Sequence, residues 1–533
     1  MRAPGSSADE VARPSVLGDL VARLETRDAL RSVLAGPAAV AGVRVGGVTH
    51  DSRQVRPGWV FVAIPGEHHD GHDHASAAVA SGAVALVLER AQPIPGVPQV
   101  LVGSSRRALA VAASWMERDP SQAMGIVGIT GTDGKTTTSY LVRSMLQAAG
   151  LRTGMLGTID VVVGGHSLGN PGRATPPEAP ELQGLLRRMV DAGDRWAVVE
   201  ATSHGLAQER VGEVAWDVAV HTNVTHEHLE FHHTPEAYRA AKRRLFERLA
   251  TGPANPDKGY GKHAVVNLDD PFATIFTSAA ADAGATLHGY GTDPDGPAAI
   301  RVTAVRERDG IEMEVRTPRW QDRVRIRLAG RFNVHNTLAA IGVGEALGLD
   351  PGAMRAGLES LERVPGRMET IDLRQPFRVI VDYAHTPDAL AKALDALRPP
   401  ADAGGGRLIC VFGSAGDRDV AKRPMMGRVA GERCRLIVVT DEDPRSEDRM
   451  AILDAIAAGA ERTGRVRGRD LLLIPDRATA IATAIGEARP GDVVVLCGKG
   501  HERSIETATG PVDWDEAAAA RTALGGLGYG DDR

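Results

Sequence analysis

A glycine-rich loop between an apolar strand and a helix is the feature that most restricts the fold of this chain. Residues 128–136 read G-I-T-G-T-D-G-K-T and lie in an apolar run that begins at Gly125. Leu141, Met145 and Ala148 then recur at helical spacing. Glycines in such a loop let backbone N–H groups converge on phosphate oxygens, and the start of the helix adds partial positive charge. The pattern therefore predicts a phosphate-binding loop at the end of a strand in an α/β sheet.

Within this loop, Lys135 is suited to pair with the outer phosphates, and the Thr136 hydroxyl is suited to ligate magnesium. The residues expected at the phosphates are Gly131, Thr132, Asp133, Gly134, Lys135, Thr136 and Thr137. The strict motif requires glycine where Ile129 stands, so a glycine-rich structural turn is the alternative interpretation. Phosphate binding is favoured because Gly-Lys-Thr between a strand and a helix has no common packing purpose.

Strand-like apolar runs alternate with helical stretches and predict an α/β fold in three domains. Residues 1–122 are expected to form a small N-terminal α/β domain, with about the first 14 residues disordered. Residues 123–364 are expected to form a central P-loop domain on a doubly wound, mostly parallel sheet, and residues 365–533 a Rossmann-like domain. Breaks near Pro120 and Pro365 mark the two boundaries.

Charge and cysteine usage narrow the class of protein. The chain has 62 basic and 68 acidic residues, a formal charge of -6, without the basic excess typical of partners of nucleic acids or anionic membranes. No segment has the length and hydrophobicity of a membrane span or the pattern of a signal peptide. Three widely spaced cysteines, Cys410, Cys434 and Cys497, fit buried free thiols. We therefore expect a cytoplasmic protein with no nucleic-acid partner and no membrane insertion.

Further motifs resemble those of the Mur ligase family, which joins amino acids to UDP-linked muramyl peptides. The loop is similar to the family's G-T-x-G-K-T-T, and residues 200–211 are similar to E-V-S-S-H-G-L-x-x-x-R-V. Residues 222–232 resemble T-N-L-T-x-D-H-L-D-F-H, and residues 238–242 resemble Y-x-x-A-K. The resemblance extends to residues 51–53, 330–336, 382–388 and 498–502, and so covers nearly the whole chain. This set of motifs is typical of the branch that adds the third amino acid of the peptidoglycan stem peptide.

The resemblance implies an ATP-dependent amide-bond ligase that acts as a monomer on the UDP-MurNAc-dipeptide UDP-MurNAc-L-Ala-D-Glu, with ATP and Mg²⁺ as cofactors. In the family the substrate carboxylate attacks the γ-phosphate of ATP, which gives an acyl phosphate and ADP. The incoming amine then displaces phosphate. Lys135 and the metal ions are expected to stabilise the charge that develops on the transferred group.

Glu200 and His228 follow apolar strands at positions suited to bind magnesium beside Thr136. The alternative interpretations are a solvated strand end for Glu200 and a capped turn for His228. Their combination with the phosphate loop favours a metal site.

Lys242 falls on an apolar stripe of a predicted helix, together with Tyr238, Leu245 and Leu249. The alternative to a chemical role is a side chain that reaches past the helix edge to water. In the Mur ligase family the matching lysine is carbamylated, which converts a cation into an anion that helps to hold a second magnesium ion. The resemblance implies that Lys242 is such an N6-carboxylysine.

The resemblance also implies binding residues for ATP and for the UDP-linked substrate. Asn333 and Asn336 would contact adenine, Asp382 the ribose and Arg367 the phosphates, although turn or cap chemistry is an alternative for the asparagines. Ser52 and Arg53 match residues near the uridine site. Thr175, Thr202, Gln208 and Arg210 match positions that hold the muramyl peptide, with Thr202 in place of the usual Ser and Pro176 interrupting the usual Thr-Thr-Pro.

The third amino acid depends on the family's D-N-P-R motif, which stands here as Glu442-Asp443-Pro444-Arg445. Arg445 is suited to a bidentate pair with a carboxylate, whereas the added charge of Asp443 favours an amine. Gly498 and Glu502 match positions that meet the distal end of diaminopimelate. The resemblance thus implies an incoming diamino acid, with meso-diaminopimelate ahead of L-lysine and L-ornithine.

Other functions share parts of this pattern. A folylpolyglutamate synthetase would share the loop and the ligase chemistry but has no equivalent N-terminal domain. A sister Mur ligase is a nearer rival, and a P-loop ATPase that acts as a switch or motor would turn over ATP alone. A catalytically inactive Mur-like binding protein is disfavoured because Lys135, Thr136, Glu200, His228 and Lys242 are all present.

Overall fold

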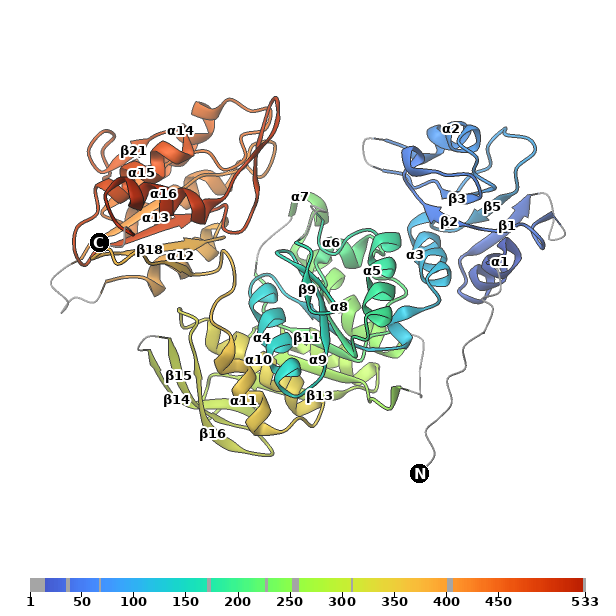
Figure 1. Ribbon diagram of the computed structural model, residues 1–533, viewed down its shortest axis with the longest axis horizontal. Coiled ribbons are helices and arrows are strands. Elements are labelled where there is room, and N and C mark those ends of the chain that lie inside the picture. Colours follow the sequence, from blue (N-terminus) through green and yellow to red (C-terminus); the bar gives the residue numbers. More distant parts are fainter. Residues whose placement is uncertain are drawn as a thin grey trace.

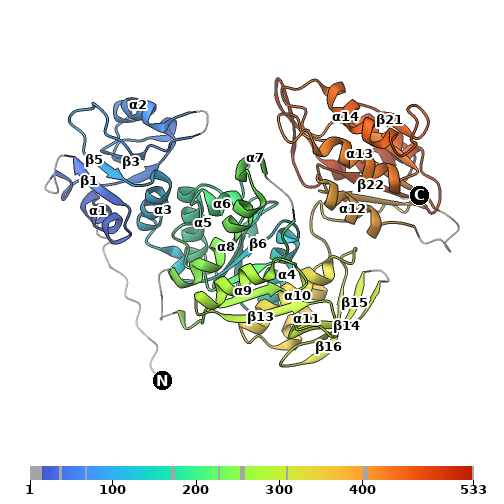
Figure 2. The same cartoon turned by 180° about the vertical axis from the view of Figure 1, so that it is seen from behind.

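The computed structural model describes residues 15–34, 39–66, 69–169, 174–225, 229–251, 258–307, 310–399 and 406–530. Figures 1 and 2 show three lobes that follow one another along the chain, each built on its own sheet. The predicted α/β fold in three domains is thereby confirmed. The disorder expected of the first residues falls outside the described residues. Among the described residues, no helix is long and apolar enough to cross a membrane.

The N-terminal lobe is a five-stranded sheet in the order β1-β5-β4-β3-β2, parallel except for β1. Its strands are β1 (Leu30–Leu34), β2 (Gly47–Thr49), β3 (Trp59–Val62), β4 (Ala85–Leu88) and β5 (Gln99–Val102), and its helices are α1 (Leu17–Thr26), α2 (Ala75–Ala80) and α3 (Ser105–Met116). The stretch after α3 is packed rather than extended, because Pro120 is buried and Asp119 pairs with Arg23 at 2.7 Å.

The central lobe is an eleven-stranded sheet in the order β16-β15-β14-β13-β12-β11-β6-β10-β7-β8-β9. Its strands are β6 (Gly125–Thr130), β7 (Thr153–Leu156), β8 (Val161–Val163), β9 (His166–Ser167), β10 (Trp196–Glu200), β11 (Val218–His221), β12 (His263–Asn267), β13 (Thr286–Gly291), β14 (Ile300–Glu307), β15 (Ile311–Arg316) and β16 (Gln321–Ile326). Its helices are α4 (Lys135–Ala148), α5 (Ala179–Asp191), α6 (Ser203–Ala207), α7 (Leu229–His232), α8 (Pro235–Thr251), α9 (Ala273–Asp282), α10 (Asn333–Ala346) and α11 (Pro351–Ser360).

The middle of this sheet is parallel and consists of β6, β7 and β10 to β14. Both ends of the sheet continue as antiparallel hairpins. Successive residues of one strand enter opposite cores, as Val127 and Ile129 do on one face and Ile126 on the other. Because both faces are apolar, helices cover both, as expected for a parallel sheet. The predicted doubly wound sheet is confirmed, and the hairpins are additional.

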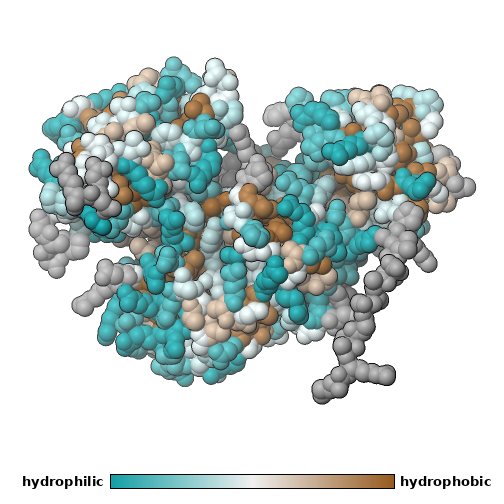
Figure 3. All heavy atoms as spheres, in the orientation of Figure 1, coloured by the Kyte–Doolittle hydropathy of each residue, from teal (hydrophilic) through white to brown (hydrophobic). Residues whose placement is uncertain are grey.

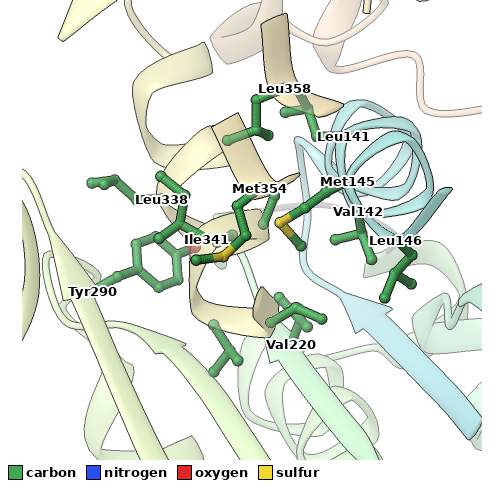
Figure 4. Close-up of a cluster of buried hydrophobic side chains, with 14 of the residues drawn as sticks. Leu141, Val142, Met145, Leu146, Val220, Tyr290, Leu338, Ile341, Met354 and Leu358 are labelled. Atoms are coloured by element: carbon green, nitrogen blue, oxygen red, sulfur yellow. The ribbon is translucent and has the colours of Figure 1, made fainter. Parts of the chain in front are cut away.

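One of these cores forms between α4, α10, α11 and the sheet (Figure 4). Leu141 and Met145 of α4 are buried there beside Met354 of α11 and Ile341 of α10. Ala148, the last residue of α4, is exposed. This core fixes the helix that begins at the phosphate loop.

The C-terminal lobe is a six-stranded sheet in the order β17-β18-β22-β19-β20-β21, parallel except for β17, as predicted for a Rossmann-like domain. Its strands are β17 (Glu369–Ile371), β18 (Arg378–Asp382), β19 (Leu408–Phe412), β20 (Leu436–Val439), β21 (Leu471–Leu473) and β22 (Val493–Cys497), followed by the hairpin β23 (Ser504–Thr507) and β24 (Gly510–Asp513). Its helices are α12 (Pro387–Ala396), α13 (Lys422–Arg433), α14 (Arg449–Glu461), α15 (Arg477–Gly486) and α16 (Glu516–Gly526). All three cysteines are free and buried in this lobe, as predicted.

The surface seen in Figure 3 is mostly hydrophilic, with apolar residues in scattered groups. The apolar residues of each lobe instead gather in the interior on the two faces of its sheet. Each lobe thus has a core of its own, and the carboxyl ends of its strands are left for polar loops.

Candidate active site

A cavity of about 1590 Å³ is lined by loops of the central and C-terminal lobes. The central lobe contributes residues 132–137, Glu200, Lys242 and the first turn of α10. The C-terminal lobe contributes Asp382 at the end of β18 and residues 383–387 after it, together with Glu442, Asp443, Arg445 and Glu502. The cavity therefore collects residues that follow parallel strands of both sheets, where ligands of such sheets bind.

The phosphate loop lies between the end of β11 and the start of α10, and its glycines leave room for this close approach. A Cβ added to Gly131 would lie 1.9 Å from the Thr222 hydroxyl oxygen, and one added to Gly134 would lie 2.3 Å from Asn336 Oδ1. Both glycines have positive φ angles, 153° and 82°. The Lys135 ammonium lies over the loop and donates to the Thr132 carbonyl at 2.6 Å.

Glu200 ends β10 next to the phosphate loop and is completely buried. Its carboxylate accepts hydrogen bonds from the Thr136 hydroxyl at 3.0 Å and from the hydroxyl and backbone N–H of Thr158 at 2.9 and 3.0 Å. Among the described residues no lysine or arginine pairs with it. A buried carboxylate beside a loop hydroxyl is the oxygen chemistry that Mg²⁺ prefers. His228, the other predicted metal ligand, lies outside the described residues.

Lys242 lies on the apolar stripe of α8, as predicted, and is 1% exposed. Its ammonium donates to the Gly131 carbonyl at 2.6 Å and lies 4.5 Å from the centre of the Tyr238 ring. The helix comes this close to β6 because residue 128 is glycine, where an added Cβ would lie 2.8 Å from a methyl carbon of Leu245. Burial, and then the charge of Lys242, lower the pKa of the nearby His221 to about 3.

The asparagines at the start of α10 are buried and bonded to one another. Asn336 Nδ2 donates to Asn333 Oδ1 at 2.8 Å, and Asn333 Nδ2 donates to the Ala329 carbonyl at 2.6 Å. The Thr138 hydroxyl of α4 donates to Asn336 at 3.4 Å. Both asparagines line the cavity, and the pair also ties α10 to the helix of the phosphate loop.

Asp382 ends β18 on the opposite side of the cavity. Its carboxylate accepts the backbone N–H groups of Met368 and Ala384 at 2.9 and 2.8 Å, and burial raises its pKa. The Arg367 guanidinium lies 4.4 Å from the centre of the Tyr383 ring. Both predicted nucleotide-binding residues of this lobe, Arg367 and Asp382, line the same cavity as the phosphate loop.

The residues predicted to hold the UDP-linked substrate are only partly brought together. Thr175, Thr202 and Arg210 line the cavity, and the Thr202 hydroxyl donates to the Thr175 carbonyl at 2.6 Å. Gln208 and the N-terminal pair Ser52 and Arg53 are not among the lining residues. Ser52 and Arg53 belong to a single helical turn of the N-terminal lobe, where the Arg53 side chain is 87% exposed and pairs with Asp51 at 2.9 Å.

The predicted residues for the third amino acid lie on two loops, which follow β20 and β22. Asp443 and Glu502 both pair with Lys499, at 2.8 and 2.5 Å between nitrogen and oxygen. Arg445, Asp443 and Glu502 line the cavity, whereas Pro444 and Gly498 are not among the lining residues. The Pro444 carbonyl lies 2.0 Å from where a Cβ on Gly416 would be, so this loop packs tightly on the loop that follows β19.

Three further residues of the site were missed from the sequence. The Thr158 hydroxyl donates to Glu200, Arg418 lines the same cavity as Arg445, and Lys499 bridges Asp443 and Glu502. Thr158 and Arg418 both come shortly after a strand, β7 and β19 respectively. The rule that ligands collect at the carboxyl ends of parallel strands therefore carried a signal for both.

Family models match along the chain. Residues 44–119 match the Mur ligase family catalytic domain, residues 129–344 the Mur ligase middle domain, and residues 366–500 the Mur ligase glutamate ligase domain. A UDP-N-acetylmuramyl-tripeptide synthetase of Roseiflexus sp. (strain RS-1) is 50% identical over 91% of this chain and 96% of its own length. A UDP-N-acetylmuramoyl-L-alanyl-D-glutamate--2,6-diaminopimelate ligase of Geobacter metallireducens is 40% identical over 92% of this chain and 96% of its own length.

Solved structures of Mur ligases have the same overall fold as this chain. The structure of a UDP-N-acetylmuramoyl-L-alanyl-D-glutamate--2,6-diaminopimelate ligase superposes with a TM-score of 0.63, at 30% identity over 91% of this chain and 96% of that one. A MurF ligase of Thermotoga maritima in complex with ADP shares the fold, with a TM-score of 0.57 at 20% identity over 90% of this chain and 96% of that one. The chain therefore belongs to the Mur ligase family, whose members are ATP-dependent amide-bond ligases.

Proposed function

We propose that this protein adds the third amino acid to UDP-MurNAc-L-Ala-D-Glu, at the expense of ATP and through an acyl phosphate. The observation that carries the proposal is the single cavity that joins a phosphate loop to Arg445 and Arg418. A guanidinium is suited to bind a substrate carboxylate, and the phosphate loop is suited to bind a nucleoside triphosphate. Activation of one carboxylate and delivery of an amine require both in one enclosed space.

The nucleotide would lie between the central and C-terminal lobes. Residues 131–137 would hold its phosphates, Asn333 and Asn336 the adenine, Asp382 the ribose, and Arg367 the phosphates from the opposite side. Thr136, Glu200 and His228 would hold a magnesium ion, which supplies charge compensation to the transferred phosphoryl group when bound. The buried Glu200 carboxylate supports this assignment because its partners include the Thr136 hydroxyl.

Lys242 would be carbamylated on Nζ and would help to hold a second magnesium ion. The burial of its amine beside the phosphate loop supports this role, because an anion there would lie close to the metal and the transferred phosphate. Carbon dioxide adds to the neutral amine, and a proton is released as the carbamate forms.

The three lobes would divide the substrates among them. Residues 1–122, with Ser52 and Arg53, would bind the UDP end, and Thr175, Thr202, Gln208 and Arg210 would hold the muramyl peptide. Residues 123–364 would bind ATP, and residues 365–533 would receive the incoming amino acid. The substrate must then extend from the N-terminal lobe into the cavity. We propose that the protein acts as a cytoplasmic monomer.

The incoming amino acid would be meso-diaminopimelate, held by Asp443, Pro444, Arg445, Gly498 and Glu502. Relatives that are 37–40% identical are named as diaminopimelate ligases, whereas the 50% identical relative is named only as a tripeptide synthetase. L-lysine and L-ornithine are the alternatives.

Phosphate release in the presence of ATP, Mg²⁺ and UDP-MurNAc-L-Ala-D-Glu tests the function. The expected result is release that requires a diamino acid, with meso-diaminopimelate faster than lysine or ornithine. Lys135→Ala should reduce the rate by about 100-fold or more, because the loop loses the cation that meets the outer phosphates. ATP turnover at the same rate without either substrate would refute the ligase assignment.

A further inference from the structure

A buried lysine stands between two carboxylates at the C-terminal end of the cavity. The Lys499 side chain is 0% exposed, and its ammonium lies 2.8 Å from Asp443 Oδ1 and 2.5 Å from Glu502 Oε2. Lys499 and Glu502 follow β22, and Asp443 follows β20. The ion pair of Lys499 with Asp443 therefore joins two loops that carry residues of the proposed amino-acid site.

Groups of the protein itself stabilise the negative charge of Asp443. Its Oδ1 accepts both the Lys499 ammonium and the backbone N–H of Glu506, at 2.8 and 2.9 Å. Asp443 stands where the family motif has asparagine, so its carboxylate alone would add one negative charge to the site. Lys499 offsets part of that charge, because its ammonium also pairs with Glu502.

Lys499 remains charged in this position. Burial disfavours its ammonium, but the charges of Glu502 and Asp443 outweigh that effect and raise the pKa of Lys499. Burial, only partly offset by Lys499, raises the pKa of Glu502. A lysine that is both buried and charged is costly unless it is paired, which makes the pair with Asp443 a determinant of the local charge.

Next to this pair, two groups face the cavity without a partner among the described residues. Glu442 is 7% exposed and its Oε2 accepts no hydrogen bond, while Arg445 Nε donates none. Residue 498 is glycine, and a Cβ there would lie only 3.5–3.6 Å from the Glu442 side chain. One carboxylate and one guanidinium are thus available to a ligand that carries both an ammonium and a carboxylate.

We propose that the Asp443–Lys499 ion pair sets the selectivity between diamino acids with a second carboxylate and those without one. This inference rests on the proposed function. Lys499 acts as a positioning residue through Asp443 and does not touch the substrate. With the pair intact, Lys499 offsets part of the negative charge of Asp443 and Glu502, and Arg445 offsets that of Glu442. Removal of Lys499 leaves the Asp443 and Glu502 carboxylates without their cation, and the added negative charge repels a second substrate carboxylate and attracts an ammonium. Removal of the Asp443 charge does the reverse.

Steady-state kinetics with meso-diaminopimelate and with L-lysine test this proposal. The quantity compared is the ratio of kcat/KM for lysine to kcat/KM for diaminopimelate. We expect Lys499→Met to raise the ratio about tenfold or more and Asp443→Asn to lower it by a similar factor. The double variant should return the ratio to within about threefold of the wild-type value, because both charges are then absent.

Lys258→Met is the matched control. Lys258 is also a nearly buried lysine, paired with Asp217 at 2.7 Å, but it does not line the cavity. Its loss should lower stability without a change in the ratio. If Lys499→Met fails to fold, as judged by circular dichroism, the kcat/KM ratio of the near-isosteric Asp443→Asn variant alone tests the proposal.

An unchanged ratio in the folded single variants, with equal loss of kcat/KM for both amino acids, would overturn the proposal. A failure of the proposed function is distinguishable, because the wild-type protein would then release no phosphate in response to any diamino acid.

Discussion

At the scale of single residues, Lys242 makes the most specific chemical prediction. Its amine is buried between the phosphate loop and the Tyr238 ring. If it is carbamylated, wild-type activity should fall in carbon-dioxide-free buffer and recover on addition of bicarbonate. Lys242→Ala should be about 100-fold less active or worse and should not respond to bicarbonate, because the second metal loses its anionic ligand.

The control for this experiment is Arg243→Ala on the same helix. Arg243 is 40% exposed and pairs with Glu247, so its loss should leave both the rate and the bicarbonate response intact. Full activity of Lys242→Ala, independent of bicarbonate, would rule out the carbamate.

Some residues of the site could be found from sequence and others could not, for a physical reason. Helical periodicity is a local property, so it placed Tyr238 and Lys242 on one buried stripe correctly. The partners of Lys499 depend on how two loops 56 residues apart meet, which no local pattern encodes. Periodicity also does not show that Ala148, the last residue of α4, is exposed.

At the scale of elements, the close packing of α11 on α4 fixes the helix behind the phosphate loop. A Cβ on Gly357 would lie 2.5 Å from the Met145 Cα, a backbone atom that cannot turn away. Gly357→Ala should therefore lower the free energy of unfolding by about 1–3 kcal/mol, because the helices must separate. It should also weaken ATP binding, since α4 begins at Lys135. Urea denaturation and nucleotide titration measure the two effects.

Gly525→Ala in α16 is the matched control, because a Cβ there meets nothing within 4 Å. It should be neutral or stabilise the protein by up to about 1 kcal/mol, since alanine is the better helix former. A Gly357→Ala variant as stable as Gly525→Ala would show that the two helices are not in tight contact.

The parallel strands were predictable because they are buried on both faces and read as continuous apolar runs, as in β20 and β22. The hairpins at the ends of the central sheet were not predictable from the sequence. Strand β14 alternates irregularly between buried and exposed positions and changes register between Val302 and Ala304, so its sequence lacks the regular period of a strand.

At the scale of the whole molecule, the arrangement of the lobes determines which sites can act together. The N-terminal lobe is fixed to the central one by the ion pair of Arg27 with Glu213, at 3.1 Å, and by the packing of α3 against α5. The cavity is lined by residues of the central and C-terminal lobes. Sequence motifs predicted the three domains, but only the assembled structure shows that Ser52 and Arg53 are not among the residues that line the cavity.

The mass of the reaction product is the most direct test of whether this protein joins an amino acid to the UDP-linked substrate. The protein is incubated with ATP, Mg²⁺, UDP-MurNAc-L-Ala-D-Glu and an equimolar mixture of meso-diaminopimelate, L-lysine and L-ornithine, and the nucleotide-linked products are analysed by mass spectrometry. We expect a single main product, heavier by diaminopimelate minus one water, formed in equal amount to ADP. Formation of ADP with no gain in mass of the UDP-linked substrate would contradict the ligase assignment.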